Sequence, residues 1–461
     1  MGRGGCHEQY CASPRVRQRG LHRLRTCIYL PARQVKVVRI FIALFNDVYC
    51  LHCMDGIFIG FYDPVTHATQ AGESHTFFRR QHVKNIFSRF TASLALVGAQ
   101  AIASAQPIPI AGLVELSGSG ATAGTNFDNG VRLAIKEINA AGGTAGRKFE
   151  YTAWDTQTQP GVAKSLAAKA VDLGVPLVIG PVFSGSILVS MNETRRAEIP
   201  NIIGGEAAQI TQQGNPYVFR SSFTQAAAMP KVVRYIADSV KARSVAVIYV
   251  NNDFGKGGRD AITREFQAAG IKVTADISTE PGQLDFSSAV LKAKQSQAEA
   301  LFIYTNEEES ARALKELRKQ GYDKPIIGES TLANDKVIEL AGDAANGVIA
   351  HVGLTPDAPN PTVQAFSQRF QTEYKFKPDH NAMKGYTGMH AAKAIFDKVG
   401  KIDAKAFAAA MHTAVISAKD YPGVLFDVRY DAKGDLDRES FIVKVINGRA
   451  QVIETLKPVA R

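Results

Sequence analysis

The chain has 461 residues, of which 45% are hydrophobic and 21% charged, an ordinary composition for a globular protein with large buried cores. Its formal net charge is +11, but residues 1–82 carry +6 and residues 83–105 carry +2, which leaves only +3 for the rest. The composition therefore excludes a basic nucleic-acid-binding surface on the main part of the chain.

The cysteines gather near the N-terminus, where Cys6, Cys11, Cys27, Cys50 and Cys53 all precede residue 54. The pair in Cys50-Leu-His-Cys53 has no second cysteine pair at zinc-site spacing, so we predict no metal site there. The rest of the chain has no cysteine and suits an oxidising compartment without depending on a disulfide.

Residues 83–105 have the layout of a secretory signal peptide. Lys84 and Arg89 give a positive start, an apolar stretch follows, and Ala103-Ser-Ala105 is a small-x-small cleavage site. We predict cleavage after Ala105. The next residue is Gln106 and not cysteine, so we expect no lipid anchor.

A signal peptide functions at a true N-terminus, yet 82 residues precede this one. We therefore predict that Val83 is the native start and that residues 1–82 are a non-native, disordered upstream extension. Peptide mapping of the mature protein tests this prediction. The apolar patch in this segment is interrupted by Asp47 and Asp55 and is too short to span a bilayer, so we expect no transmembrane helix in the mature chain.

After the signal, hydrophobic patterns typical of strands and helices alternate. Expected strands include IPIAGLVEL, KFEYTAW, VPLVIG and PNII, and expected helices cover residues 126–140, 160–173 and 186–198. Repeated switching between the two periods indicates parallel βαβ units.

A second round of the same kind begins near residue 225. We expect helices at 226–240, 256–269, 286–296, 308–320, 361–374 and 385–399, strands between them, and a final hairpin that turns at Asn447-Gly448. The fold class is therefore α/β, with two doubly wound parallel-sheet lobes whose strand ends face a crevice.

The stretch VIGPVFSGSI, residues 178–187, places Ser184, Gly185 and Ser186 where a strand ends and a helix begins. Backbone N–H groups at such a point form an anion site, and the hydroxyls add hydrogen bonds for a carboxylate. Serine is also a preferred helix cap, so the spacing alone leaves a purely structural role open.

From Pro107 to the C-terminus the chain resembles the periplasmic leucine/isoleucine/valine-type solute-binding proteins of ABC importers, which have the type I periplasmic binding fold. The resemblance rests on LVELSGSGATAGTNFDNGVRLAIKEINAAGG, VIGPVFSGS, GGEAAQITQQG, VNNDFGKGG and YDAKGDLDRESF. It implies one lobe from residues 106–222 and 353–430, and a second from 223–352 and 431–461. Three hinge segments are implied near 221–225, 350–354 and 428–432.

The resemblance also implies ligand contacts. The serine that binds a ligand carboxylate corresponds to Ser184, and the next loop corresponds to Gly204, Gly205 and Glu206, with glutamate where threonine is usual. An aromatic residue that closes over the ligand corresponds to Phe254.

Three further residues are implied in the second lobe. The acidic partner of a ligand ammonium lies near Glu329, although Ser330 fits the alignment as well. Asn306 and Glu307 approach the crevice where an aromatic residue is usual, and Ala123 stands where the family often has tyrosine.

The added carboxylates disfavour an anionic ligand side chain and favour a donor or a positive charge. Two alternatives stay open. Glu206 either faces the ligand or points outward, and the run Glu307–Glu309 either faces the crevice or caps its helix.

The resemblance implies a non-enzymatic, monomeric periplasmic protein that captures a small amino-acid-like solute by hinge closure and delivers it to an ABC permease, without cofactor or metal. A ligand-sensing protein of the same fold is an alternative. A dinucleotide-dependent oxidoreductase is a weaker one, because Gly118-Ser-Gly-Ala-Thr-Ala-Gly124 departs by one residue from the phosphate-binding motif and Asp155 lies too far along the chain.

Overall fold

The computed structural model describes residues 106–458, and all of these belong to one of the two units into which the chain divides, Phe90–Arg461. The predicted upstream extension and signal peptide lie outside the described residues. Strands and helices alternate along the described part, and the strands form a five-stranded, a seven-stranded and a three-stranded sheet.

The five-stranded sheet is entirely parallel, in the order β2-β1-β3-β4-β5. Its strands are β1 Ile108–Val114, β2 Phe149–Asp155, β3 Val178–Ile179, β4 Asn201–Ile203 and β5 Val218–Arg220.

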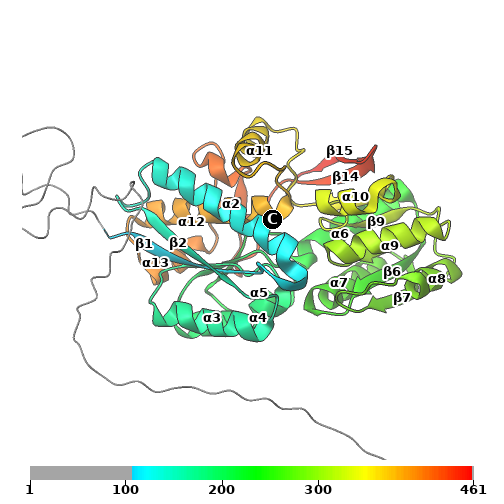
Figure 1. Cartoon of the computed structure of the whole chain (residues 1–461), viewed down its shortest axis with the longest axis horizontal. Helices are drawn as coiled ribbons and strands as arrows, with labels where there is room; N and C mark the ends of the chain where they lie inside the picture. Colours follow the sequence, from blue (N-terminus) through cyan, green and yellow to red (C-terminus); the bar gives the residue numbers. More distant parts are fainter. Residues whose placement is uncertain (1–105, 459–461) are drawn as a thin grey trace, which may run out of the picture. The chain divides into compact units, whose positions relative to one another are not determined.

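Alternate residues of β1 face opposite sides, as the period of two requires: Ile108 and Ile110 pack with one cluster, and Ala111 and Leu113 with another. Both faces are covered, α2 and α12 lying on one side and α3 and α4 on the other (Figure 1). The helices of this first lobe are α2 Ala121–Ala140, α3 Pro160–Asp172, α4 Ser184–Arg196, α5 Gln209–Gln212, α11 Pro361–Tyr374, α12 His380–Val399 and α13 Ala404–Met411.

The seven-stranded sheet has the order β15-β14-β10-β9-β8-β6-β7, and only β14 and β15 run antiparallel to their neighbours. Its strands are β6 Ser244–Val250, β7 Lys272–Thr279, β8 Ala300–Tyr304, β9 Ile326–Glu329, β10 Ile349–Val352, β14 Ser440–Ile446 and β15 Arg449–Leu456. The helices of this second lobe are α6 Gln225–Tyr235, α7 Asp253–Ala268, α8 Ser287–Gln295, α9 Glu307–Lys319 and α10 Asp335–Ala341.

The predicted α/β class with two parallel-sheet lobes is confirmed. The predicted helix 361–374 and the final hairpin have the expected bounds. Two helices begin five residues earlier than predicted: α2 begins at Ala121 and not at 126, and α12 begins at His380 and not at 385.

Three segments connect the lobes. The first two follow β5 and β10, close to the predicted hinge positions. The third lies between Asp437 and Ser440, later than the predicted 428–432, because β12 Val428–Tyr430 pairs with β11 Val415–Ile416 and β13 Leu436–Asp437 in the small antiparallel sheet.

Within residues 106–458, none of the helices combines the length and the apolar character needed to cross a lipid bilayer.

Candidate functional site

A cavity of about 400 Å³, including the part open to solvent, lies where strand ends of both sheets meet. The first lobe contributes residues that follow β1, β3 and β4, and the second lobe residues that follow β6, β8 and β9. The lining consists of Ala123, Val182, Phe183, Ser184, Gly204, Gly205, Glu206, Phe254, Asn306, Glu307, Thr331, His380, Asn381 and Lys384.

The turn between β3 and α4 is held in place by a buried carboxylate that directly follows β1. Glu115 accepts hydrogen bonds from the backbone N–H groups of Val182 and Phe183, both at 3.1 Å. Burial raises the pKa of Glu115 to about 7, although these two bonds oppose the shift. The turn therefore presents the first residue of α4, Ser184, to the cavity in a fixed orientation.

The loop after β4 packs directly against Ser184. The Ser184 hydroxyl oxygen accepts a hydrogen bond from the backbone N–H of Ala207 at 3.3 Å. A Cβ on Gly205 would lie 2.4 Å from Ile187 Cδ1 and 3.0 Å from the Val182 carbonyl oxygen, so this close approach favours glycine. The start of α4 and this loop thus form one continuous wall in which helix N–H groups without intrahelical partners face a polar cavity, an arrangement suited to a carboxylate.

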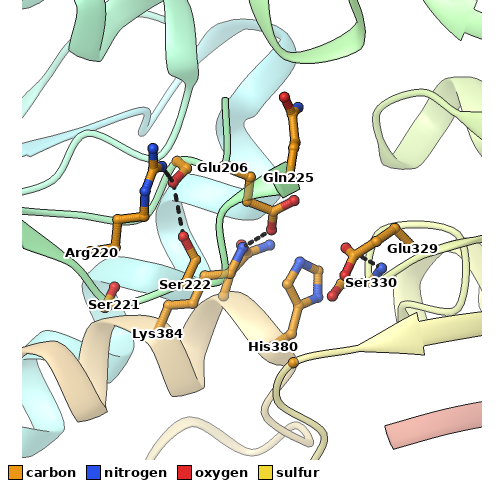
Figure 2. A network of polar contacts seen from close by, with 12 residues as sticks. Glu206, Arg220, Ser221, Ser222, Gln225, Glu329, Ser330, His380 and Lys384 are labelled. Atoms are coloured by element: carbon orange, nitrogen blue, oxygen red, sulfur yellow. Dashed lines mark hydrogen bonds and ion pairs between the residues drawn. The ribbon is translucent and has the colours of Figure 1, made fainter. Parts of the chain in front are cut away.

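A buried guanidinium fixes this loop from behind (Figure 2). Arg220, fully buried, donates to the carbonyl oxygens of Gly205 at 2.6 Å and Ala207 at 2.8 Å, and forms an ion pair with Asp435 at 2.6 Å. Ser222 donates a second hydrogen bond to Gly205 O at 2.9 Å. Since its carbonyls are engaged on the far side, the loop is held rigidly at the cavity.

Glu206 points into the cavity wall and not outward. Its Oε1 accepts from Lys384 Nζ of α12 at 2.7 Å, and its Oε2 accepts from the Tyr304 hydroxyl of β8 at 3.2 Å. Burial raises the pKa of Glu206, and the charge of Lys384 opposes that shift. The outward alternative is therefore wrong, and Glu206 links the two lobes through Tyr304.

Phe254 of the second lobe closes one side of the cavity and is supported by Tyr304. Phe254, in the first turn of α7, stacks on Tyr304 with ring centroids 4.2 Å apart. Gln225 donates to both the Phe254 carbonyl oxygen and the Tyr304 hydroxyl, at 2.8 and 3.1 Å. The position of the Phe254 ring is therefore set by packing and by a backbone hydrogen bond.

The acidic residues at the start of α9 have different roles, one at the helix end and one in the cavity lining. Asn306 and Glu309 form a reciprocal capping box, so Glu309 serves the helix end. Glu307 lines the cavity, where its Oε1 accepts from Asn381 Nδ2 of the first lobe at 3.3 Å. Burial raises the pKa of Glu307 to about 8, and the charges of Asp379 and Glu308 add to this.

The first two turns of α12 supply three lining residues, His380, Asn381 and Lys384. Asp379 caps the helix by accepting from the backbone N–H of Ala382 at 2.8 Å. Burial and the neighbouring Lys384 lower the pKa of His380 well below its usual value, so its imidazole is neutral at pH 7. Lys384 therefore provides the positive charge at this end of the cavity.

Seven of the ten predicted ligand-binding residues line the cavity: Ser184, Gly204, Gly205, Glu206, Phe254, Asn306 and Glu307. Gly185 and Ser186, which follow on α4, do not belong to the lining.

Glu329 also lies outside the lining. It accepts from buried His351 at 2.9 Å and from the backbone N–H of Ser330. Burial opposes the ionisation of Glu329, but these bonds outweigh it and hold its pKa below the usual value. Its carboxylate is thus committed within the protein, and the next residue but one, Thr331, reaches the cavity instead.

The sequence reasoning missed His380, Asn381 and Lys384, because the helix was expected to begin at residue 385. The signal was present: Asp379 is a favoured N-cap residue, and an earlier helix start puts these three side chains in the first two turns of the helix.

The glycine-rich segment after β1 does not form a phosphate-binding loop. Asp155 accepts hydrogen bonds from the backbone N–H groups of Leu116, Ser117 and Gln157, at 2.9, 3.1 and 2.8 Å. Its carboxylate therefore joins the loop after β1 to the loop after β2 and is not offered to a ribose. Within residues 106–458, no group of three or more His, Cys, Asp or Glu side chains is placed to hold a metal ion.

Similarity to known proteins agrees with a ligand site between two lobes. The family described as periplasmic binding protein matches residues 107–450. The leucine-, isoleucine-, valine-, threonine- and alanine-binding protein of Pseudomonas aeruginosa is 25% identical over 77% of this chain and 94% of that protein. The Leu/Ile/Val-binding protein BraC3 of Rhizobium johnstonii is 27% identical over 78% of this chain and 96% of its own length.

Solved structures agree in fold. The branched-chain amino acid transporter substrate-binding protein LivJ of Streptococcus pneumoniae, in complex with isoleucine, matches with a TM-score of 0.70 at 24% identity, over 77% of this chain and 100% of that one. A solute-binding protein of an ABC transporter from R. palustris, in complex with benzoate, matches with a TM-score of 0.71 at 21% identity, over 77% and 98%.

Proposed function

Since the chain belongs to the periplasmic binding protein family, we propose that it is an extracytoplasmic solute-binding protein that captures a small amino-acid-like solute between its two lobes and delivers it to the permease of an ABC transporter. The relatives named above bind amino acids, according to their names. In this proposal the protein works as a periplasmic monomer without catalysis, secreted through residues 83–105 and not lipid-anchored. Its lobes comprise residues 106–222 with 353–437, and 223–352 with 440–458, because the third interlobe segment lies between Asp437 and Ser440.

The observation that carries the proposal is the composition of the cavity wall. One side, with Ser184, Gly205 and Lys384, comes from the first lobe, and the other, with Phe254 and Glu307, comes from the second. A solute bound there touches both lobes, so it stabilises the closed state relative to the open one. Closure excludes water, which strengthens charge-assisted hydrogen bonds of about 1.5–3 kcal/mol each.

A carboxylate fits the wall formed by the first lobe. The Ser184 hydroxyl, whose oxygen already accepts from Ala207, keeps its own proton for a ligand acceptor. Lys384 Nζ has three donors and uses one for Glu206. Positive helix ends and a lysine therefore favour an anionic group at this side of the cavity.

The test is a thermal-shift screen of the purified protein against amino acids, their amides and small carboxylates, followed by calorimetric titration of each hit. We expect Ser184→Ala and Phe254→Ala to lose most of the stabilisation. Ser190→Ala is a matched control, because Ser190 is buried on the same helix and donates to Ile187 O away from the cavity. Unchanged shifts in both site variants would reject the assigned pocket.

A ligand-sensing role uses the same binding chemistry. Reconstitution with the permease and ATPase separates the two functions, because only a transport protein stimulates solute uptake into vesicles.

A further inference from the structure

Three side chains of the cavity lining have a hydrogen-bonding atom without a partner among residues 106–458. These atoms are Nε2 of His380 and Oδ1 of Asn381, at the start of α12, and Oγ1 of Thr331, which follows β9. Each atom is accessible, since none is among the buried side-chain atoms that lack a partner. The cavity therefore has hydrogen-bonding capacity from both lobes that the protein itself does not use.

Hydrogen bonds from Asn334 determine which atom His380 presents. The side-chain oxygen of Asn334 accepts from the backbone N–H of Lys336 and its Nδ2 donates to Asp379, both at 2.9 Å, which sets the orientation of the amide. The same Nδ2 donates to His380 Nδ1 at 3.5 Å. Since Nδ1 is an acceptor, Nε2 carries the proton and is a donor. These bonds also bring the start of α12 close to the segment that follows β9.

The other two side chains complement this donor. Asn381 Nδ2 donates to Glu307 at 3.3 Å, so Asn381 Oδ1 remains as an acceptor. Thr331 adds a hydroxyl, which both donates and accepts. The apolar residues of the lining come from α2, from the turn before α4 and from α7: Ala123, Val182, Phe183 and Phe254. This part of the lining is therefore polar, with one donor, one acceptor and one hydroxyl.

These groups lie one helical turn from the residue that suits the solute's carboxylate. Lys384 follows Asn381 by three residues and His380 by four, which places the three side chains on one face of α12 with an axial spacing of about 5 Å. Lys384 belongs with the carboxylate side because it bonds to Glu206 of the loop after β4. A small amino acid is long enough to reach from Lys384 with its carboxylate to the start of α12 with its side chain.

We propose that His380, Asn381 and Thr331 determine specificity and select a solute with an uncharged hydrogen-bonding side chain, a carboxamide or a hydroxyl group. This inference rests on the proposed solute-binding function and specifies the side chain of the solute. A carboxamide matches both ends, because its oxygen accepts from His380 Nε2 and its NH₂ group donates to Asn381 Oδ1. An aliphatic side chain of the same shape keeps water from these atoms without replacing its hydrogen bonds, so it is rejected.

A charged side chain fits less well. The ammonium of Lys384 is committed to Glu206 and, in the proposed function, to the carboxylate of the solute. A second carboxylate on the solute would approach Glu307, which bonds to Asn381, without a cation to compensate it. A cationic side chain would meet the positive end of α12. We therefore expect asparagine to be preferred to aspartate as well as to leucine.

Two pairs of amino acids with nearly the same shape test the inference: asparagine with leucine, and threonine with valine. Titration calorimetry of the purified protein at pH 7 measures the four affinities and that of aspartate. We expect asparagine to bind about tenfold or more tightly than leucine and aspartate, and threonine to bind more tightly than valine, because the apolar members leave hydrogen-bonding atoms of the site unpaired.

Thr331→Val and Asn381→Leu replace polar side chains with apolar ones of the same shape. We expect each to lower the ratio of asparagine to leucine affinity about five- to tenfold, mainly by weakening asparagine. A purely structural defect would weaken both amino acids and leave the ratio unchanged. Thr331→Val removes no side-chain hydrogen bond within residues 106–458, so it decides the question even where Asn381→Leu impairs folding.

Thr125→Val, at an exposed position of α2 outside the lining, is the control and keeps the wild-type ratio. Thermal unfolding of each variant verifies that it folds.

The outcomes separate the inference from the proposed function. Leucine binding as tightly as asparagine, or a wild-type ratio in Thr331→Val, overturns the selection of a polar side chain and leaves the solute-binding function intact. Binding of none of the five amino acids overturns the amino-acid-like ligand of the proposed function, and this inference with it.

Discussion

Arg438 donates from Nη2 to the carbonyl oxygen of Ser221 at 3.1 Å, which joins the third interlobe segment to the first. Its Nε donates to Gly353 O of the second segment at 3.4 Å, so one buried side chain contacts all three. The guanidinium also lies over the Phe223 ring, 5.5 Å from its centroid. Burial lowers the pKa of Arg438 to about 10, which still leaves it charged at pH 7.

Replacing Arg438 with methionine removes the donor shared by the three segments and leaves two buried carbonyls without it. We expect a loss of about 2–4 kcal/mol in the free energy of unfolding, from unsatisfied carbonyls and lost cation–π contact. Denaturant titration measures this loss. Arg449→Met, at an exposed position of β15, is the matched control; equal stability of the two variants would show that Arg438 does not stabilise the hinge.

Gly185 permits the close approach of the two lobes. A Cβ at this position would lie 2.9 Å from Asp253 Oδ2 at the start of α7, across the interlobe boundary. We expect Gly185→Val to fold normally but to close poorly, with ligand affinity lower by about tenfold, or 1.4 kcal/mol. Small-angle scattering with and without the identified ligand reports closure.

Two comparisons sharpen the Gly185 prediction. Gly185→Ala has a smaller effect, because the end of the Asp253 side chain can shift. Gly161→Val, in the first turn of α3 with no neighbour within 4 Å, leaves affinity unchanged. Wild-type affinity in Gly185→Val would mean that α4 and α7 do not approach this closely in the bound state.

The sequence was sufficient to predict the alternation of strands and helices, because apolar periodicity depends on local burial that each segment carries itself. Strand ends that gather at one edge of a parallel sheet pointed to Ser184, and the resemblance to the solute-binding proteins added Gly205 and Phe254.

The sequence did not predict which buried charged residues pair with one another. Lys384 lies 178 residues from Glu206, and His351 lies 22 from Glu329, so spacing gives no indication of which acid is paired and which is free. The structure distinguishes Glu307 from Glu329 because it brings α12 and β10 to these acids.

Stability should depend on pH through Glu307. Its pKa is raised by burial from an ordinary 4.5 to about 8, so between these values the folded protein holds a proton that the unfolded chain has lost. Folding stability therefore falls as pH rises through this window, with a slope of up to about 1.4 kcal/mol per pH unit. Glu115, with a pKa raised to about 7, contributes in the same direction at lower pH.

The effect of Glu307 on stability is best measured between pH 7 and pH 8. At lower pH the buried, neutral His380 opposes the trend, because the unfolded chain binds a proton at this histidine and the folded protein does not. Without ligand, we expect the unfolding free energy of the wild-type protein to fall there, and that of Glu307→Gln to remain flatter. Denaturant titration at several pH values measures both. Parallel profiles would show that Glu307 is already ionised in the empty cavity.

The buried pair of Glu206 and Lys384 should behave as a unit. Their atoms are 2.7 Å apart and both side chains are about nine-tenths buried, so removing either partner leaves an uncompensated charge. We expect Glu206→Gln and Lys384→Met each to lower the free energy of unfolding by about 3 kcal/mol, whereas the double variant loses far less than the sum. A double-mutant cycle in denaturant measures this coupling.

Ligand binding should reveal a role of Lys384 that measurements of stability do not. Lys384 faces the expected carboxylate, so the double variant, although folded, binds a carboxylate-bearing ligand roughly 10- to 100-fold more weakly than the wild type. Lys377→Met is the comparison, because that lysine pairs with Asp335 and Asp357 away from the cavity lining and leaves binding largely intact. Full affinity in the folded double variant would mean that the Glu206–Lys384 pair stabilises the cavity wall only, and that the α4 end alone holds the ligand's negative charge.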